Sequence, residues 1–305
     1  MKIHGVPIDD TFAEAFTMRV ARLVITARNR RWAMIAAQKL TGFATSVIGC
    51  KCEAGVEREL ADLETPDGRP GVSILFMTMD KESMPTRLIE RIGQTVLTCP
   101  TTACFDGLPE APDRVPVGSR LRFFGDGFQS SKMIAGQRYW RIPVMEGEFL
   151  VQENFGMMKG IGGGNFLILA QSADAALQAA EAAVAAIDPI PGVILPFPGG
   201  VVRSGSKVGS RRMKSMIAST NDAFCPTLRA VTTSALPEGV NSVLEIVLNG
   251  VDRDAIDRGM KAGIEAACKP GVVSISAGNY NRKLGPHLFY LRPILGGTTA
   301  LEQPA

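Results

Sequence analysis

The sequence predicts an α+β fold with two similar lobes, and three observations lead to this prediction. Apolar, β-branched runs alternate along the chain with segments whose apolar residues recur at helical spacing. The order β-α-β-β-α-β, the split βαβ or ferredoxin-like pattern, occurs once in each half. A length of 305 residues suffices for two domains of ordinary size. We therefore expect two ferredoxin-like lobes related by internal duplication.

The first lobe, called proximal, is expected over residues 1–149. Asn29 is expected to cap its first helix and Gly42 to end it, since these residue types favour helix termini. In chain order, the expected strand, helix, strand, strand, helix and strand lie at residues 22–27, 29–40, 44–48, 72–79, 82–92 and 95–98. Further strands that join the lobes are expected at residues 120–124, 139–144 and 148–151.

The second lobe, called distal, is expected over residues 150–305. Ser172 or Asp174 is expected to cap its first helix, and Asp252 its second. In chain order, the expected elements lie at residues 166–170, 172–187, 192–195, 242–248, 252–268 and 271–276, with a closing strand at residues 288–291. The tail, residues 296–305, lacks periodicity and is expected to be mobile.

Composition and charge exclude several classes of protein. The net charge is +3 and aromatic residues make up 6%, so neither a concentrated basic face nor the stacking aromatics of an RNA-binding sheet are expected. The N-terminus lacks the apolar core of a signal peptide, and no run approaches 18 apolar residues. The sequence therefore predicts a cytoplasmic protein that binds neither nucleic acid nor membrane.

Cysteine and histidine patterns do not predict a metal site. The chain has two histidines, His4 and His287, one near each end, which disfavours a Ser-His-Asp triad. The cysteines have poor spacing for a zinc ribbon, and we expect free, buried thiols rather than disulfides. These cysteines are Cys50, Cys52, Cys99, Cys104, Cys225 and Cys268.

Two glycine-rich segments resemble nucleotide-binding loops without fulfilling their requirements. Residues 160–164 precede a predicted strand, whereas a dinucleotide-binding glycine turn follows a strand and opens a helix. In residues 200–207, Ser206 stands where a Walker A motif needs lysine. Both segments are expected to be tight or flexible connections.

Residues 197–227 are the most distinctive stretch of the chain. They contain Phe-Pro-Gly-Gly-Val-Val-Arg-Ser at 197–204, Ser-Lys-Val-Gly-Ser at 206–210 and Ser-Thr-Asn-Asp-Ala-Phe-Cys-Pro-Thr at 219–227. Together these motifs resemble the formylmethanofuran:tetrahydromethanopterin formyltransferase family. The resemblance extends from about residue 3 to residue 292, with further matching segments at residues 10–16, 65–71, 123–127, 163–166 and 276–279.

The resemblance implies a two-lobed, homo-oligomeric (dimeric or tetrameric) formyltransferase of one-carbon metabolism. Its co-substrates would be a methanofuran-type furan amine and tetrahydromethanopterin or its dephospho form, with no metal or tightly bound prosthetic group. The slightly basic charge balance and the Arg- and Ala-rich composition suit a bacterial version from one-carbon metabolism, in the oxidation of formaldehyde to formate, where such a protein resembles one subunit of a formyltransferase/hydrolase complex. Two rival interpretations are a non-catalytic, pterin-binding scaffold subunit and an ACT-like regulatory module, but the latter explains the 197–227 loop poorly.

Glu245 is the candidate catalytic residue. Formyl transfer between two amines needs aligned carriers, a donor to the tetrahedral oxyanion and a group that moves a proton. Glu245 lies in an otherwise apolar strand, where alternation places it on the face of Val243 and Val247. Desolvation would favour the neutral acid. Aligning the two halves pairs Glu245 with Phe76. The alternatives are a solvated strand face or an ion pair with an arginine.

The 197–227 loop supplies the candidate substrate-binding residues. A cationic segment suits a furan cofactor that carries several carboxylates, whereas Arg211, Arg212 and Lys214 are expected to be solvated. The polar cluster before Cys225 could orient the formyl group or the pterin, or could simply cap a turn. The candidates are Gly199, Gly200, Arg203, Ser206, Lys207, Ser219, Thr220, Asn221 and Asp222. Weaker candidates are Asp67, Arg69 and Asp126.

Overall fold

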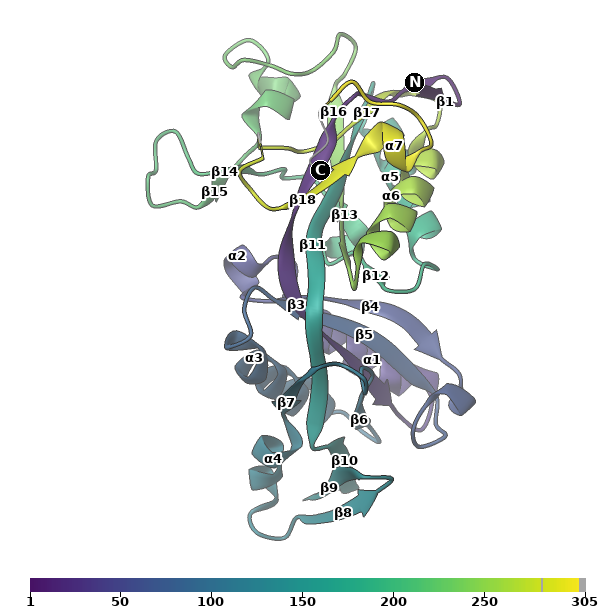
Figure 1. Cartoon of the computed structure of the whole chain (residues 1–305), viewed down its shortest axis with the longest axis vertical. Helices are drawn as coiled ribbons and strands as arrows, with labels where there is room; N and C mark the ends of the chain where they lie inside the picture. The colour runs from purple at the N-terminus through teal and green to yellow at the C-terminus, as the bar shows by residue number, and fades with distance from the viewer. Residues whose placement is uncertain (281, 302–305) are drawn as a thin grey trace. The chain divides into compact units, whose positions relative to one another are not determined.

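The computed structural model describes residues 1–280 and 282–301 and shows a mixed α/β fold with a large β-sheet. The chain forms two compact units (Figure 1). The central unit is Met18–Gly160, and the discontinuous unit combines Met1–Thr17 with Ile161–Ala305. The predicted lobes, 1–149 and 150–305, differ from these units because the start of the chain pairs with a late strand, β18 (His287–Tyr290).

The central unit contains a four-stranded antiparallel sheet. Its strand order is β6-β3-β5-β4. The bounds are β3 Phe12–Thr26, β4 Glu53–Leu60, β5 Gly71–Thr78 and β6 Ala103–Asp106. Helices α1 (Arg30–Thr41) and α3 (Ser83–Arg91) pack their buried residues against one apolar core with this sheet. As predicted, the Asn29 side chain accepts a hydrogen bond from Trp32 N (3.2 Å), and Gly42 ends α1.

The remainder of the central unit consists of shorter elements. Strands β8, β9 and β10 form an antiparallel meander, and β10 also pairs in parallel with β6. The elements are α2 Val47–Cys50, η1 Asp62–Glu64, η2 Ile92–Val96, β7 Asp113–Pro116, α4 Gly118–Leu121, η3 Arg122–Gly125, β8 Ser130–Ile134, β9 Gln137–Val144 and β10 Gly147–Gln152. The strands predicted at 139–144 and 148–151 are thus confirmed.

Three strands predicted in the first half are wrong, because each segment forms a helical turn. Residues 44–48 lead into α2, where the Ser46 hydroxyl caps Ile48 N. Residues 95–98 continue from the π-helical turn η2, whose Ile92 and Val96 are both buried. Residues 120–124 lie in α4 and η3. Short apolar runs fit a strand or a buried helical turn equally well, so periodicity could not separate the two.

The discontinuous unit repeats the strand order of the central unit. Its antiparallel order is β17-β11-β16-β12, and β13 also pairs with β16. The bounds are β11 Asn154–Ala170, α5 Ala173–Ile187, β12 Val193–Ile194, β13 Val201–Val202, β16 Ser242–Gly250, α6 Arg253–Ala267 and β17 Val272–Ser276. Helices α5 and α6 share one apolar core with the sheet, and Ser172 and Asp252 cap them as predicted.

Short elements complete the discontinuous unit. They are β1 Lys2–Ile3, β2 Val6–Pro7, η4 Pro198–Gly200, β14 Lys207–Val208, β15 Ala218–Ser219, η5 Asp222–Phe224, η6 Pro226–Leu228, β18 and α7 Leu291–Ile294. The predicted mobile tail is held at its start, because Asp10 accepts hydrogen bonds from Thr299 Oγ1 (2.6 Å) and Ala300 N (2.9 Å). Its residues 302–305 lie outside the described part of the chain.

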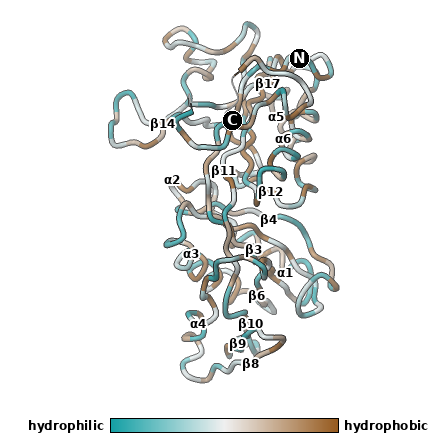
Figure 2. The backbone as a smooth tube through the Cα atoms, in the orientation of Figure 1, coloured by the Kyte–Doolittle hydropathy of each residue, from teal (hydrophilic) through white to brown (hydrophobic). Residues whose placement is uncertain are grey.

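The distribution of apolar residues agrees with this two-unit packing. Hydrophobic and hydrophilic residues alternate along the trace rather than gathering in one long segment (Figure 2). Within residues 1–280 and 282–301, no helix is long and apolar enough to cross a membrane. All six cysteines are free; Cys52, Cys104 and Cys268 are buried and the others are half-buried. In the same part of the chain, no three His, Cys, Asp or Glu side chains gather where they could hold a metal ion.

Candidate active site

Glu245 lies at the centre of the sheet of the discontinuous unit. On β16 it stands opposite Leu167 of β11 on one side and Val202 of β13 on the other. Leu167 in turn stands opposite Ser276 of β17. Strand β13 belongs to the motif at residues 197–204, so main-chain pairing brings this motif directly beside the candidate carboxylate.

Glu245 faces away from helices α5 and α6. Its neighbours Leu244 and Ile246 pack into the core with both helices, and side chains alternate along a strand. Val243, on the same face as Glu245, packs with an apolar cluster that includes Leu167 and Leu236. The carboxylate therefore lies on the sheet face that is covered by loop residues rather than by helices.

The predicted alignment of Glu245 with Phe76 is wrong, because the two side chains lie on opposite faces of their sheets. Phe76 packs in the core that contains α1, so it lies on the helix-facing side of β5. The residue of β16 on the corresponding side is Ile246 or Leu244. Because successive side chains of a strand point to opposite faces, a slip of one residue exchanges the two faces.

The Glu245 carboxyl group has the electrostatic character of a weak acid. Its side chain is half-buried, and no hydrogen bond or ion pair joins it to another residue in the described part of the chain. Burial without a compensating cation disfavours the charged form and raises the pKa of Glu245 from 4.5 to about 7. Of the two alternative interpretations, the ion pair with an arginine does not occur among residues 1–280 and 282–301.

The structure brings Lys207 and Asp222 together as an ion pair. Lys207 opens β14, and Asp222 opens η5 after strand β15, which pairs with β14. The hydrogen bond and charge of Lys207 hold the pKa of Asp222 below its ordinary value. From the sequence we predicted that Lys207 and Asp222 contact ligands separately, whereas in the structure they pair with each other.

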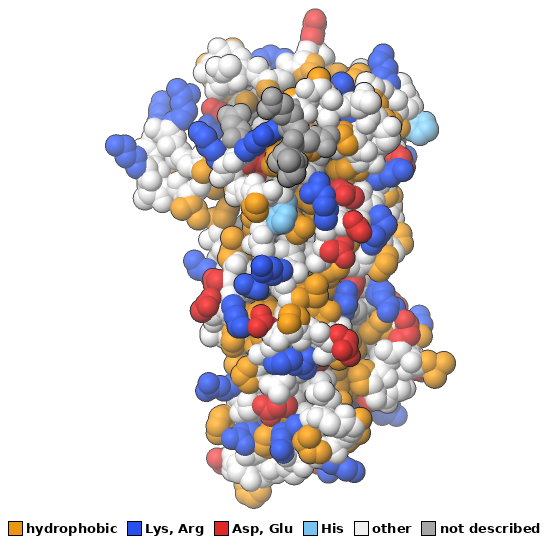
Figure 3. All heavy atoms as spheres, viewed as in Figure 1, with side chains coloured by type: hydrophobic (Ala, Val, Ile, Leu, Met, Phe, Trp, Pro, Cys, Tyr) orange, Lys and Arg blue, Asp and Glu red, His pale blue; other side chains and the backbone are white. Residues whose placement is uncertain are grey.

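The other loop candidates divide into internally bonded and free groups. Ser219 Oγ donates to Gly209 O (2.6 Å), and Thr220 Oγ1 donates to Ser204 O (3.5 Å). Asn221 precedes η5 without capping it through its side chain. Arg203 is exposed, and in the described part of the chain no carboxylate pairs with it. The exposed cations Arg211, Arg212 and Lys214 lie in the connection between the paired strands β14 and β15. Figure 3 shows Lys and Arg side chains gathered on this hairpin.

The two candidate glycines play different structural roles. Both have positive φ, +61° at Gly199 and +77° at Gly200, which glycine adopts without strain. A Cβ at Gly200 would lie 2.7 Å from Val184 Cγ2, so this glycine permits close packing against α5. A Cβ at Gly199 would meet nothing within 4 Å, so space for an approaching ligand exists only at Gly199.

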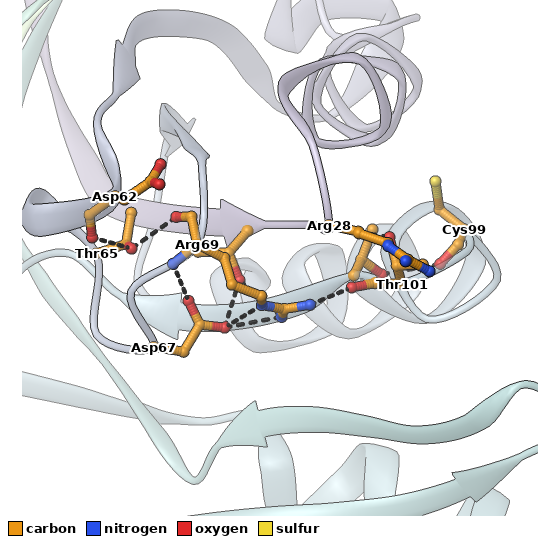
Figure 4. A network of polar contacts seen from close by, with 9 residues as sticks. Arg28, Asp62, Thr65, Asp67, Arg69, Cys99 and Thr101 are labelled. Carbon is orange, nitrogen blue, oxygen red and sulfur yellow. Dashed lines mark hydrogen bonds and ion pairs between the residues drawn. The ribbon is translucent and has the colours of Figure 1, made fainter.

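Asp67 and Arg69, the weaker candidates, form an internal network in the central unit (Figure 4). The Arg69 guanidinium donates to Asp67 Oδ2 (2.8 Å), Thr101 O (2.6 Å) and Thr26 Oγ1 (3.0 Å). Arg69 and Thr101 of this network line a cavity of about 580 Å³, together with residues that include Arg28 and Cys99. Because the Arg69 guanidinium has hydrogen-bond acceptors within the protein, the network fits a structural role that stabilises its loop. Asp126, in a left-handed turn after η3, likewise fits a structural role.

Sequence analysis did not single out Glu14 and Tyr280, which the structure places in this site. The Tyr280 hydroxyl donates to the carbonyl oxygen of Ser206, and Tyr280 N donates to the Glu14 carboxylate. Burial raises the pKa of Tyr280, and the charge of Glu245 adds to the increase. Both residues lie in or beside motifs of the family resemblance (residues 10–16 and 276–279), so the motifs themselves were the available signal.

Comparisons with known proteins cover nearly the whole chain and identify its family. Two family models match in succession: formylmethanofuran-tetrahydromethanopterin formyltransferase over residues 1–144, and its proximal lobe over residues 147–294. In that description the proximal lobe is thus the second half, whereas sequence analysis gave the label to the first. The formyltransferase of Methylococcus capsulatus is 59% identical over 97% of this chain and 100% of its own length. That of Methanosarcina barkeri is 52% identical, covering 96% and 100%.

Solved structures of formyltransferases also match this chain over nearly its whole length. The Methanosarcina barkeri enzyme superposes with a TM-score of 0.92 at 52% identity, covering 96% of this chain and 100% of that one. A chain of the formyltransferase/hydrolase complex from Methylorubrum extorquens, solved with methylofuran, gives 0.94 at 47% identity, covering 98% and 99%. The fold and these matches define a formyltransferase. The chain belongs to the formylmethanofuran–tetrahydromethanopterin formyltransferase family.

Proposed function

We propose that this chain transfers a formyl group between the amine of a methanofuran-type cofactor and tetrahydromethanopterin or its dephospho form. The curated relatives are named for this activity. Their matches cover nearly the whole of this chain and all of each relative. The formyltransferase/hydrolase complex from Methylorubrum extorquens, to which a similar chain belongs, was solved in complex with methylofuran. The reaction belongs to one-carbon metabolism, where it serves formaldehyde oxidation to formate.

Glu245 is the acid–base residue of this reaction, and one observation supports the assignment most. A half-buried carboxyl group without a partner in the described residues, with its pKa raised to about 7, lies next to strand β13 of the substrate motif. A group with a pKa near the working pH can both donate and accept a proton. When the accepting amine attacks the formyl carbon, neutral Glu245 can donate a hydrogen bond to the tetrahedral oxyanion or a proton to the departing amine nitrogen, and the resulting carboxylate then accepts the proton that the attacking amine loses.

The 197–227 loop binds the two carriers. Arg203 is a free cation in the described part of the chain, and Lys207 carries a second positive charge on the same segment, so both suit the carboxylates of a furan cofactor. A carboxylate of the cofactor that binds Lys207 would compete with Asp222, or bind beside it, for the same ammonium group. The remaining substrate-binding residues in this proposal are Gly199, Gly200, Ser206, Ser219, Thr220, Asn221 and Asp222.

The proposal also covers assembly, location and origin. We propose a cytoplasmic homo-oligomer that joins other subunits, since the similar chain from Methylorubrum extorquens belongs to a formyltransferase/hydrolase complex. The domain division remains the predicted one, near residue 149. The orders β6-β3-β5-β4 and β17-β11-β16-β12 are the same arrangement of a split βαβ unit, which supports two ferredoxin-like lobes that arose by duplication.

One assay separates this proposal from a non-catalytic, pterin-binding scaffold. The purified chain alone is mixed with formylated furan cofactor and reduced pterin, and formyl-pterin is followed by its ultraviolet absorbance. Transfer that depends on enzyme concentration and is lost in Glu245→Gln supports the proposal. Pterin binding without transfer, under conditions where a known relative is active, would support the scaffold instead.

A further inference from the structure

Residues 277–280 and 282–286, between β17 and β18, lack regular secondary structure, yet two buried polar side chains hold them in place. Asn165 exchanges hydrogen bonds with Gly278, with Gly278 N donating to Oδ1 (2.7 Å) and Nδ2 donating to Gly278 O (3.3 Å). The fully buried Glu14 carboxylate accepts from the backbone N–H groups of Tyr280, Arg282 (2.7 Å) and Leu284 (2.8 Å). Backbone groups that a sheet would otherwise satisfy are therefore satisfied by side chains.

Three motifs of the family resemblance meet at this segment. Glu14 lies in the 10–16 motif, Asn165 in the 163–166 motif and Gly278 in the 276–279 motif. A fully buried carboxylate is costly unless several donors satisfy it, and Glu14 has three. The roles proposed for Glu245 and for the 197–227 loop do not explain why these three motifs meet here.

The side chain that this arrangement holds is Tyr280. Its hydroxyl donates to Ser206 O, in the residues that connect β13 with β14. Strand β13 places Val202 opposite Glu245, and Ser206 immediately precedes Lys207. Tyr280 thus joins the fixed segment to residues 202–207, which run from Val202, opposite Glu245, to Lys207. The proximity of Glu245 to the phenol is also felt electrostatically.

We propose that Tyr280 is a positioning residue of the formyltransferase site: its hydroxyl holds the Ser206 carbonyl, and so the start of β14, in place beside Glu245. In this arrangement Glu14 influences the reaction through Tyr280 rather than by contact with a carrier. The inference rests on the proposed roles of Glu245 and the 197–227 loop, and deepens them by explaining how the loop is held.

The primary test is Tyr280→Phe, which removes only the hydroxyl. Loss of one neutral hydrogen bond should lower kcat/KM by roughly 2- to 10-fold, mainly through a higher KM for the furan cofactor. Hydrogen exchange of residues 203–209 should accelerate. Tyr139→Phe is the matched control, because Tyr139 lies in the central unit and packs edge-on against Phe105. It should change neither quantity.

A double-mutant cycle tests the role of Glu14. If Glu14 acts through Tyr280, the combined Glu14→Gln and Tyr280→Phe variant should lose clearly less activity than the product of the two single losses. Multiplicative losses would overturn that part of the proposal. Wild-type kcat/KM and unchanged loop exchange in Tyr280→Phe would overturn the whole inference, while the function would stand as long as Glu245→Gln remains impaired. Failure of the function itself would instead appear as absence of transfer by the wild-type chain.

Discussion

Each unit of this protein carries a glutamate on a strand of its sheet, Glu57 on β4 and Glu245 on β16, and the two glutamates have opposite surroundings. In the central unit, Glu57 is buried and accepts hydrogen bonds from Arg22 Nε (2.8 Å), Arg22 Nη2 (2.8 Å) and Ser73 Oγ (2.6 Å). In the discontinuous unit, Glu245 has no such partner among the described residues, and its pKa is raised to about 7. A satisfied carboxylate remains charged and supports structure, whereas a carboxyl group without a cation can exchange a proton.

Breaking the Arg22–Glu57 ion pair of the central unit should have the largest effect, a loss of folding stability. Arg22→Met removes the ion pair and both guanidinium hydrogen bonds of the buried Glu57, so the free energy of unfolding should fall by about 3 to 5 kcal/mol. Arg58→Met is the control, because the Arg58–Glu64 pair is exposed on both sides (48% and 44%) and its loss should cost less than about 1 kcal/mol. Urea unfolding of both variants measures the difference. Equal destabilisation would show that the Glu57 pair has no special role.

Removing the acid of Glu245 should abolish most turnover without unfolding the protein. Glu245→Gln should lower kcat by roughly 10²-fold or more, the usual effect of losing one acid–base or oxyanion-stabilising group. Glu57→Gln in the central unit serves as the comparison, and its residual folded fraction should turn over normally. Near-normal turnover in folded Glu245→Gln would retire the catalytic assignment.

The raised pKa of Glu245 predicts a specific pH dependence of stability. Between the unfolded value near 4.5 and the folded value of about 7, the folded protein binds more protons than the unfolded chain, so stability falls as pH rises through this window. Compared with wild type, Glu245→Gln should therefore gain roughly 1 to 3 kcal/mol of stability on going from pH 4.5 to pH 8. If neutral Glu245 is the active form, kcat/KM should also decline above about pH 7. A stability difference that does not change with pH would contradict the assigned pKa.

The smallest effect is expected in the cationic loop. Lys207→Ala should raise the KM for the furan cofactor several-fold at low salt, roughly the effect of 1 kcal/mol, and less at high salt because ions screen the attraction. Lys214→Ala, which removes an exposed cation of the same hairpin, should have a weaker effect. A KM for Lys207→Ala that matches wild type at every salt concentration would argue against carboxylate binding at this position.

What the sequence by itself determined is local. The caps at Asn29, Ser172 and Asp252 were predictable because the side chain and the amide it accepts from are only three residues apart. The strand containing Glu245 was predictable from its apolar alternation, and the loop at 197–227 from its motifs. The segments at 44–48, 95–98 and 120–124 were not, because short apolar runs fit a strand and a buried helical turn equally well.

Tertiary structure decided which side chains meet. The pairing of Val202 with Glu245, the ion pair of Lys207 with Asp222 and the hydrogen bond from Tyr280 to Ser206 join residues 15 to 74 positions apart in the sequence. The sheet face that Glu245 occupies followed from strand register, and the predicted alignment of the two halves had reversed that face. The sequence specified an acid in a strand, whereas the packing buries Glu245 with no cation paired to it among the described residues and so raises its pKa.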